Sequence, residues 1–192
     1  TSNNEASSTL RQAVNLAKKN NSPCALVVRK ESFNNYKLQN DFKSSFSLNR
    51  EQSIKIIIDQ LDETDIVVST TGVASRELFE YRETLKQGHE KDFLTVGGMG
   101  HANQIALGIA LYKPNSQVFC FDGDGAILMH MGALAINANV GCKNLKHIIF
   151  NNGAHDSVGG QPTVAHKISI SAAAKSFGYH KILIAENEDE IK

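Results

Sequence analysis

Four short apolar runs, each followed by a loop of small, polar or acidic residues, constrain the fold of this chain more than any other feature. The runs occupy residues 65–70, 93–96, 117–121 and 145–150. Their apolar residues are continuous instead of alternating, which is typical of strands buried on both faces of a parallel sheet. Helical patterns follow the first three runs, at 71–85, 97–111 and 124–138. This alternation predicts an α/β fold with a doubly wound parallel sheet flanked by helices.

The two ends of the chain indicate a piece of a longer protein. Residues 1–30 hold an amphipathic helix at 9–20 and an apolar strand at 23–28, which we expect to be the C-terminal helix and strand of an upstream domain. Residues 31–50 are polar without periodicity and are expected to be a linker. Residues 51–192 form the main domain, which we expect to be truncated at its C-terminus. The last elements predicted in it are a helix at 170–179 and a strand at 181–185.

Composition narrows the classes of function. The chain has 192 residues with 20 basic and 20 acidic side chains, so its formal charge is zero and no basic surface for nucleic acid or membrane is expected. We do not expect its polar start to act as a signal peptide, and no stretch of the given sequence is apolar for long enough to cross a bilayer. Cys24, Cys120 and Cys142 stand among apolar neighbours, which favours reduced core thiols in a cytoplasmic protein.

One loop places a carboxylate where the fold otherwise favours an anion. Asp124 lies between Gly123 and Gly125, at the start of a helix whose free N–H groups favour phosphate. A helix terminus contributes only about 0.3–1 kcal/mol, whereas two like charges roughly 4 Å apart repel by about 4 kcal/mol at an effective dielectric near 20. A divalent cation resolves this conflict. Asn152 ends the next apolar run, and a few protein oxygens completed by phosphate and water are typical of Mg²⁺.

These residues carry a resemblance to the thiamine diphosphate-dependent decarboxylases. Gly123-Asp124-Gly125 followed by Asn151-Asn152 resembles the motif with which that family binds diphosphate and magnesium. The amino-acid sequence at 70–80, 97–111, 123–135 and 151–163 resembles that of the phosphonopyruvate decarboxylases. The sulfopyruvate decarboxylases share the first three of these stretches in looser form. The resemblance implies the thiamine diphosphate-binding fold. Residues 51–192 would then be its diphosphate-type domain, and residues 1–30 the end of its pyrimidine-binding domain.

The same resemblance implies a ligand set. Asp124 and Asn152 would bind Mg²⁺ through their side chains, and Ala154 would bind it through its backbone carbonyl. Thiamine diphosphate would be held by backbone groups of two glycine-containing loops, and the side chain of Met99 would lie beneath the bent cofactor. The residues expected to contact the cofactor are Thr71, Gly72, Gly97, Met99, Gly123, Asp124, Gly125, Ala126 and Asn152.

The implied reaction is decarboxylation of 3-phosphonopyruvate to phosphonoacetaldehyde and CO₂, with sulfopyruvate or a related 2-oxoacid as the alternative substrate. The cofactor supplies the difficult chemistry. The glutamate that activates it in this family belongs to the pyrimidine-binding domain, which another subunit of a homo-oligomer would supply. We therefore expect no catalytic residue in this chain and no activity from it alone. His155 and Ser157 are candidate substrate contacts, with solvated loop residues as the equal alternative.

Two other functions fit parts of the sequence. Gly98-Met99-Gly100 after one strand and Asp122 at the end of the next approximate the fingerprint of an NAD-dependent oxidoreductase, although Asn103 replaces its third glycine. A cofactor-binding subunit without catalysis of its own is the second alternative.

Four other polar side chains stand in or near these stretches. Arg76 is either a phosphate ligand or an ordinary surface arginine. His130 and His147 are expected to be structural, and the role of His101 is left open.

Overall fold

The computed structural model describes residues 3–34 and 46–192, and the chain divides into two compact units, residues 1–39 and 40–192. In the first unit, helix α1 (Asn3–Asn20) covers the helix expected at 9–20. The strand expected at 23–28 does not form, and these residues are extended and exposed. A strand needs a neighbour to satisfy its backbone, and no described segment pairs with this one. Much of the linker expected at 31–50 lies outside the described residues.

The second unit is built on a parallel sheet of four strands, which confirms the predicted fold class. The strands are β1 (Ile66–Ser69), β2 (Asp92–Leu94), β3 (Val118–Gly123) and β4 (Leu145–Phe150), in the spatial order β2-β1-β3-β4. The chain moves from β1 to one side of the sheet and then crosses to the other side. The order of the strands therefore reverses between β1 and β3, where open α/β sheets form a crevice for ligands.

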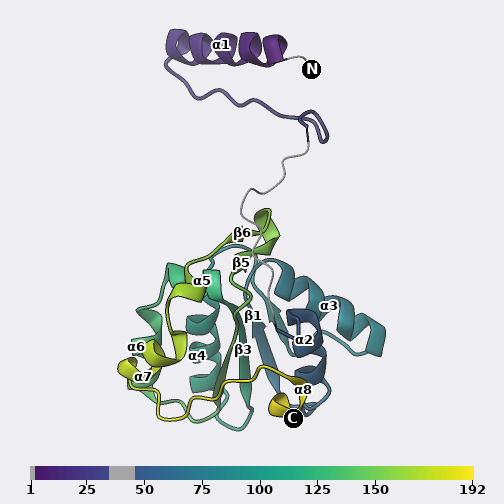
Figure 1. Cartoon of the computed structure of the whole chain (residues 1–192), viewed down its shortest axis with the longest axis vertical. Helices are drawn as coiled ribbons and strands as arrows, with labels where there is room; N and C mark the ends of the chain where they lie inside the picture. The colour runs from purple at the N-terminus through teal and green to yellow at the C-terminus, as the bar shows by residue number, and fades with distance from the viewer. Residues whose placement is uncertain (1–2, 35–45) are drawn as a thin grey trace. The chain divides into compact units, whose positions relative to one another are not determined.

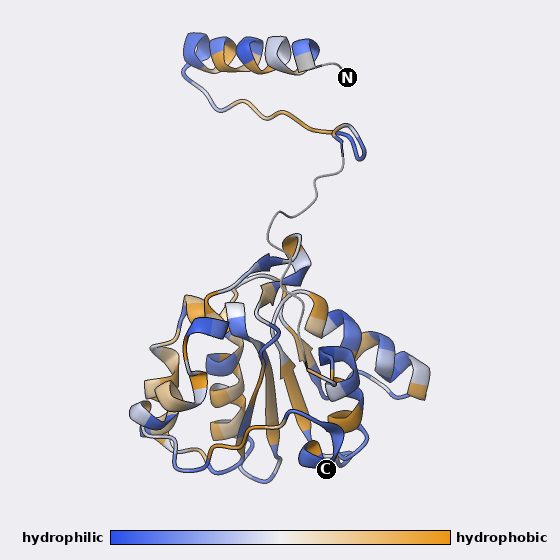
Figure 2. Cartoon of the chain, in the orientation of Figure 1, coloured by the Kyte–Doolittle hydropathy of each residue, from blue (hydrophilic) through white to orange (hydrophobic). Residues whose placement is uncertain are grey.

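Helices cover both faces of this sheet (Figure 1). On one face, α2 (Arg50–Ile58) and α3 (Val73–Leu85) pack over a core that contains Leu78 and Phe121. On the other face, α4 (Ala102–Tyr112) packs over Val68 and Cys120, with α6 (Ala133–Val140) and α7 (Ile170–Phe177) beside it. Figure 2 shows apolar strands in the middle of the unit, with α3 more hydrophilic than the largely apolar α4 and α6.

Helix α2 was not predicted from the sequence. It begins with a capping box, in which the side chain of Asn49 accepts a hydrogen bond from the backbone N–H of Gln52 at 2.8 Å. The Gln52 side chain in turn accepts from the backbone N–H of Asn49 at 3.2 Å. Ile54 and Ile58 are buried against the sheet, so a short helix with little intrinsic signal is stabilised by tertiary packing.

Two other expectations differ from the structure. The single helix expected at 124–138 is divided into α5 (Asp124–Met129) and α6, because the backbone leaves the helical region at His130. The strand expected at 181–185 is an irregular segment, after which the chain ends in the short helix α8 (Glu188–Ile191).

A small antiparallel hairpin follows β4 at the carboxyl end of the sheet. Its strands are β5 (Ala154–His155) and β6 (Gln161–Pro162), and Ala154 lies opposite Pro162. The turn η1 (Asp156–Val158) connects them, and η2 (Ala165–Lys167) comes after β6. The hairpin therefore brings the residues after β6 back beside the end of β4.

None of the described helices combines the length and apolar character needed to span a membrane.

Candidate functional site

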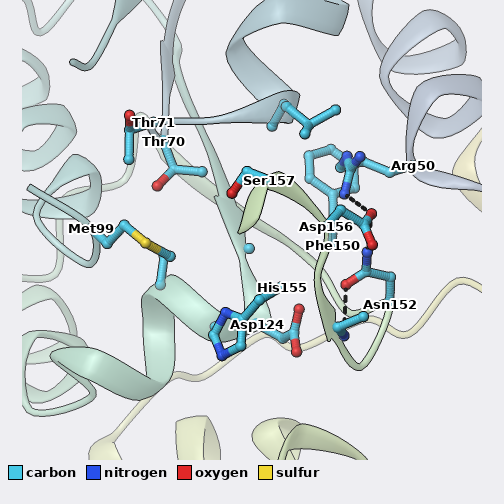
Figure 3. Close-up of a pocket in the computed structure, with 16 residues that line it drawn as sticks. Arg50, Thr70, Thr71, Met99, Asp124, Phe150, Asn152, His155, Asp156 and Ser157 are labelled. Atoms are coloured by element: carbon cyan, nitrogen blue, oxygen red, sulfur yellow. Dashed lines mark hydrogen bonds and ion pairs between the residues drawn. The ribbon is translucent and has the colours of Figure 1, made fainter. Parts of the chain in front are cut away.

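A pocket opens at the carboxyl end of the sheet, at the point where the strand order reverses. Figure 3 shows Thr70, Thr71 and Met99 on one side of it and Arg50 and Asn152 on the other. Strand pairing explains this convergence, because Ser69 is in register with Phe121, and Gly123 with Phe150. The loops that follow β1, β3 and β4 therefore begin at one level of the sheet.

The structure brings together most of the site residues expected from the sequence. Of the expected set, Gly72 and Gly97 lie beside the pocket without lining it. A Cβ built on Gly72 would lie 3.4 Å from the side chain of Ser157. The N–H of Gly97 donates to Oγ1 of Thr71 at 3.0 Å. The expected residues that line the pocket are Thr71, Met99, Gly123, Asp124, Gly125, Ala126, Asn152, Ala154, His155 and Ser157.

Asp124 is the most deeply buried charged group of the pocket, with 2% of its surface exposed. Burial raises the pKa of its carboxyl group, and hydrogen bonds from Thr163 and from backbone N–H groups act in the opposite direction. No lysine or arginine in the described part of the chain forms an ion pair with it. A buried carboxylate that is stabilised mainly by hydrogen bonds and not by a lysine or arginine keeps part of its desolvation cost, so Asp124 is a favourable place for a bound cation.

Asn152 is held by its own loop. Its Oδ1 accepts from the N–H of Ala154 at 3.2 Å, and its Nδ2 donates to Oδ2 of Asp156 at 2.6 Å. Together with the carboxylate of Asp124 and the carbonyl of Ala154, this amide forms a set of hard oxygen donors around one pocket. Such a set fits Mg²⁺ and does not fit a soft transition metal.

Arg50 is a pocket residue that the sequence reasoning missed. It forms a bidentate pair with Glu77, at 2.8 and 3.0 Å, and its Nη1 lies 2.9 Å from Oδ2 of Asp156. A ladder of polar contacts thus runs from α3 through Arg50 and Asp156 to Asn152. No local pattern could have identified Arg50, because its partner Asp156 is 106 positions away. Arg76, the arginine considered from the sequence, is exposed and lies outside the pocket lining.

Gly125 and Gly100 allow close packing around α5. A Cβ on Gly125 would lie 2.5 Å from Cε1 of His155, so the imidazole ring rests directly on this glycine. Gly100 has φ +84°, and a Cβ there would lie 2.6 Å from the carbonyl oxygen of Ala126. Gly100 excludes a larger residue both for space, because the close atom is backbone, and for backbone conformation, whereas a side chain at Gly125 would have to displace the His155 ring.

Asp122 points away from the pocket and into the core. It is fully buried, its carboxylate accepts from Asn103 Nδ2 at 3.4 Å, and it lies 3.3 Å from Nε2 of His147. It is therefore not placed to bind a ribose, which argues against the NAD-dependent alternative. The ring of His147 is 3% exposed and packs in the sheet, in keeping with a structural role.

The described residues that line the pocket include no cysteine and no histidine other than His155. All three cysteines are free, and Cys120 is buried, which raises the pKa of its thiol. Cys24, expected in a core, is exposed in the first unit, where the expected strand is missing. His101 and His130 contact each other, with ring centroids 4.2 Å apart.

Comparison with known families assigns the part of the chain that builds the pocket. Residues 70–192 match the family described as "Thiamine pyrophosphate enzyme, C-terminal TPP binding domain". The chain belongs to this family. The match covers the strand ends, the glycine-containing loops and the hairpin that build the pocket.

Individual curated relatives are decarboxylases or decarboxylase subunits. The chain is 35% identical over 142 residues to a phosphonopyruvate decarboxylase of Streptomyces viridochromogenes, which covers 74% of this chain and 34% of that protein. It is 35% identical over 143 residues to the sulfopyruvate decarboxylase subunit beta of Methanocaldococcus jannaschii, covering 72% of this chain and 73% of that subunit. The chain thus spans about a third of the length of the phosphonopyruvate decarboxylase and most of the length of the beta subunit.

Among solved structures, the fold resembles a thiamine diphosphate-dependent 4-hydroxybenzoylformate decarboxylase of Rhodococcus jostii RHA1. The TM-score is 0.60 at 19% identity, over 85% of this chain and 32% of that chain. At this identity the likeness supports the fold alone.

Proposed function

We propose that this chain supplies the diphosphate- and magnesium-binding half of a thiamine diphosphate-dependent decarboxylase. One observation carries the proposal. The buried carboxylate of Asp124, which forms no ion pair with a lysine or arginine of the described residues, shares a pocket with the amide of Asn152 at the strand ends of β3 and β4. The membership of residues 70–192 in the TPP-binding family supports the same cofactor.

The residues present fit the group. Asp124, Asn152 and the carbonyl of Ala154 would hold Mg²⁺, and the backbone N–H groups of Gly125 and Ala126, at the start of α5, would hold the diphosphate. Thr71 and Gly72 would hold the diphosphate from the loop after β1. Gly97 and Met99 would contact the aminopyrimidine. When bound, the cofactor would stabilise the negative charge that develops when a 2-oxoacid loses CO₂.

The substrate proposed is 3-phosphonopyruvate, because the stretch 151–163 resembles the phosphonopyruvate decarboxylases in particular. Sulfopyruvate is the second candidate, supported by the 35% identity to a sulfopyruvate decarboxylase beta subunit. The two acids differ in a phosphonate and a sulfonate group, which make similar demands on a binding site. His155 and Ser157, which line the pocket, are the proposed substrate contacts. The activating glutamate and the rest of the pyrimidine-binding domain would come from another subunit.

A melting experiment on the full chain tests the cofactor. A ligand that binds only the folded state stabilises it by about 2.7 kcal/mol at 100 times its dissociation constant. We expect thiamine diphosphate with Mg²⁺ to raise the melting temperature and NAD to leave it unchanged. Thiamine diphosphate without divalent cation should have a much smaller effect. A shift with NAD alone, or an identical thiamine diphosphate response with and without Mg²⁺, would contradict the proposal.

Product analysis tests the substrate. The chain, supplied with a pyrimidine-binding partner subunit, is offered phosphonopyruvate and sulfopyruvate in parallel, and CO₂ release is measured. We expect faster release from phosphonopyruvate, and no release from the chain alone. Preference for sulfopyruvate would favour the second candidate, and turnover by the isolated chain would refute the division of roles.

A further inference from the structure

Thr163 contacts both segments that carry the candidate oxygen ligands, Asp124 in one and residues 152–154 in the other. Nothing in the sequence pointed to it. It follows β6, and its backbone N–H donates to the carbonyl of Gly153 at 2.8 Å. Its hydroxyl donates to Oδ2 of Asp124, 39 positions earlier in the chain. Thr163 is 5% exposed and Asp124 is 2% exposed, so water does not compete strongly for either contact.

The direction of the hydroxyl proton follows from its other contact. Oγ1 of Thr163 accepts a hydrogen bond from the N–H of Ala165 at 3.2 Å. A threonine hydroxyl has one proton, and an ionised carboxylate is only an acceptor. The proton of Thr163 is therefore directed at Asp124. A hydrogen bond to a charged group is stronger than one between neutral groups, so this contact fixes the plane of the carboxylate.

The hydrogen bond from the backbone N–H of Thr163 to Gly153 fixes the second ligand-bearing segment, residues 152–154. Gly153 lies between Asn152 and Ala154, and it adopts the left-handed conformation, with φ +67°. A hydrogen bond to its carbonyl holds the backbone between the two residues that would supply oxygen ligands, Asn152 through its amide and Ala154 through its carbonyl. The β5–β6 hairpin, with Ala154 opposite Pro162, is what returns Thr163 to this position.

We propose that Thr163 is a positioning residue for the cation that the proposed function assigns to this pocket, because one side chain and its own N–H hold both ligand-bearing segments at once. The inference rests on the proposed function. Groups that orient metal ligands in this way are worth about 10–100-fold in metal affinity. Without the hydroxyl, the Asp124 carboxylate keeps only its hydrogen bonds to backbone N–H groups, and the cation must supply more of its orientation on binding.

The test is a Mg²⁺ titration of the full chain at a fixed, saturating concentration of inorganic diphosphate or thiamine diphosphate, followed by melting temperature. Thr163→Val removes the hydroxyl and keeps both the shape and the N–H. We expect the Mg²⁺ concentration for half the maximal shift to rise about 10–100-fold. Thr163→Ser should restore it to within a few fold. Thr84→Val is the matched control, since that hydroxyl donates to the carbonyl of Glu80 in α3, outside the pocket lining.

The outcomes separate this inference from the function on which it rests. A wild-type chain that responds to neither probe with Mg²⁺ refutes the proposed function and the role of Thr163 with it. A wild-type chain that responds, with an unchanged Mg²⁺ midpoint in Thr163→Val, refutes the positioning role alone. A purely structural role would lower the melting temperature without ligand and leave the midpoint unchanged. If Thr163→Val does not fold, Thr163→Ala is titrated against the same two criteria.

Discussion

Exchanging glycine for alanine at Gly100 and at Gly108 should change stability in opposite directions. At Gly100, φ is +84°, and a Cβ would lie 2.6 Å from the carbonyl oxygen of Ala126 and 2.8 Å from Cδ2 of His130. The left-handed conformation costs a side chain about 1–2 kcal/mol, and overpacking costs about 1–3 kcal/mol. Gly100→Ala should therefore lower the free energy of unfolding by about 2–5 kcal/mol.

Gly108 provides the matched control. It lies inside α4, and a Cβ there would meet no atom within 4 Å. Alanine is favoured over glycine in a helix by about 0.5–1 kcal/mol, so Gly108→Ala should be stabilising.

Urea and thermal denaturation of the full chain measure both changes. In a protein of this size, about 1 kcal/mol shifts the melting temperature by about 2–4 °C. Gly100→Ala should therefore melt at least ~4 °C below the wild type, and Gly108→Ala slightly above it. If Gly100→Ala melts with the wild type, the close approach of this loop to α5 is wrong.

Two further predictions concern charged groups at the pocket. Arg50→Lys should lower the free energy of unfolding by about 1.5–3 kcal/mol, because lysine cannot reproduce the bidentate pair with Glu77 and the contact with Asp156. Lys55→Gln removes an exposed pair with Glu51 and should change the free energy of unfolding by less than about 1 kcal/mol. Urea denaturation measures both variants, and equal losses of stability would contradict a special role of the Arg50 contacts. Burial raises the pKa of Asp124 above 3.8. Without metal, the protonated carboxyl therefore contributes to the free energy of unfolding below about pH 4, and this contribution is lost as the pH rises through the raised pKa. Urea denaturation without metal should therefore show Asp124→Asn gaining on the wild type between about pH 4 and pH 7, and a constant difference would contradict the burial argument.

The sheet and its carboxyl edge could be predicted because their signals are local. A continuous apolar run such as 118–121 has few alternatives to a buried strand, and Gly123-Asp124-Gly125 must lie where that strand ends. The parallel arrangement then places every following loop at one edge. These steps were sufficient to expect Asp124 and Asn152 in one place, and they line one pocket.

The remaining features depend on contacts between distant segments. The division of α5 from α6 at His130 coincides with the packing of His130 against Gly100, which the helical pattern does not encode. Arg50 and Thr163 reach the site through partners 106 and 39 positions away. The strand expected at 23–28 failed for the opposite reason, since its local pattern is strong and no described strand pairs with it.

The three strands that carry the pocket residues are adjacent, with β3 in the middle of β1, β3 and β4. A ligand that contacts the loops after all three strands stabilises their folded arrangement relative to any opening that separates them. Backbone amides in the centre of the sheet, which exchange with deuterated solvent only through such openings, should then exchange more slowly while the ligand is bound. Slower exchange at Val67, Cys120 and Ile148 would therefore report occupancy of a pocket that none of these residues lines.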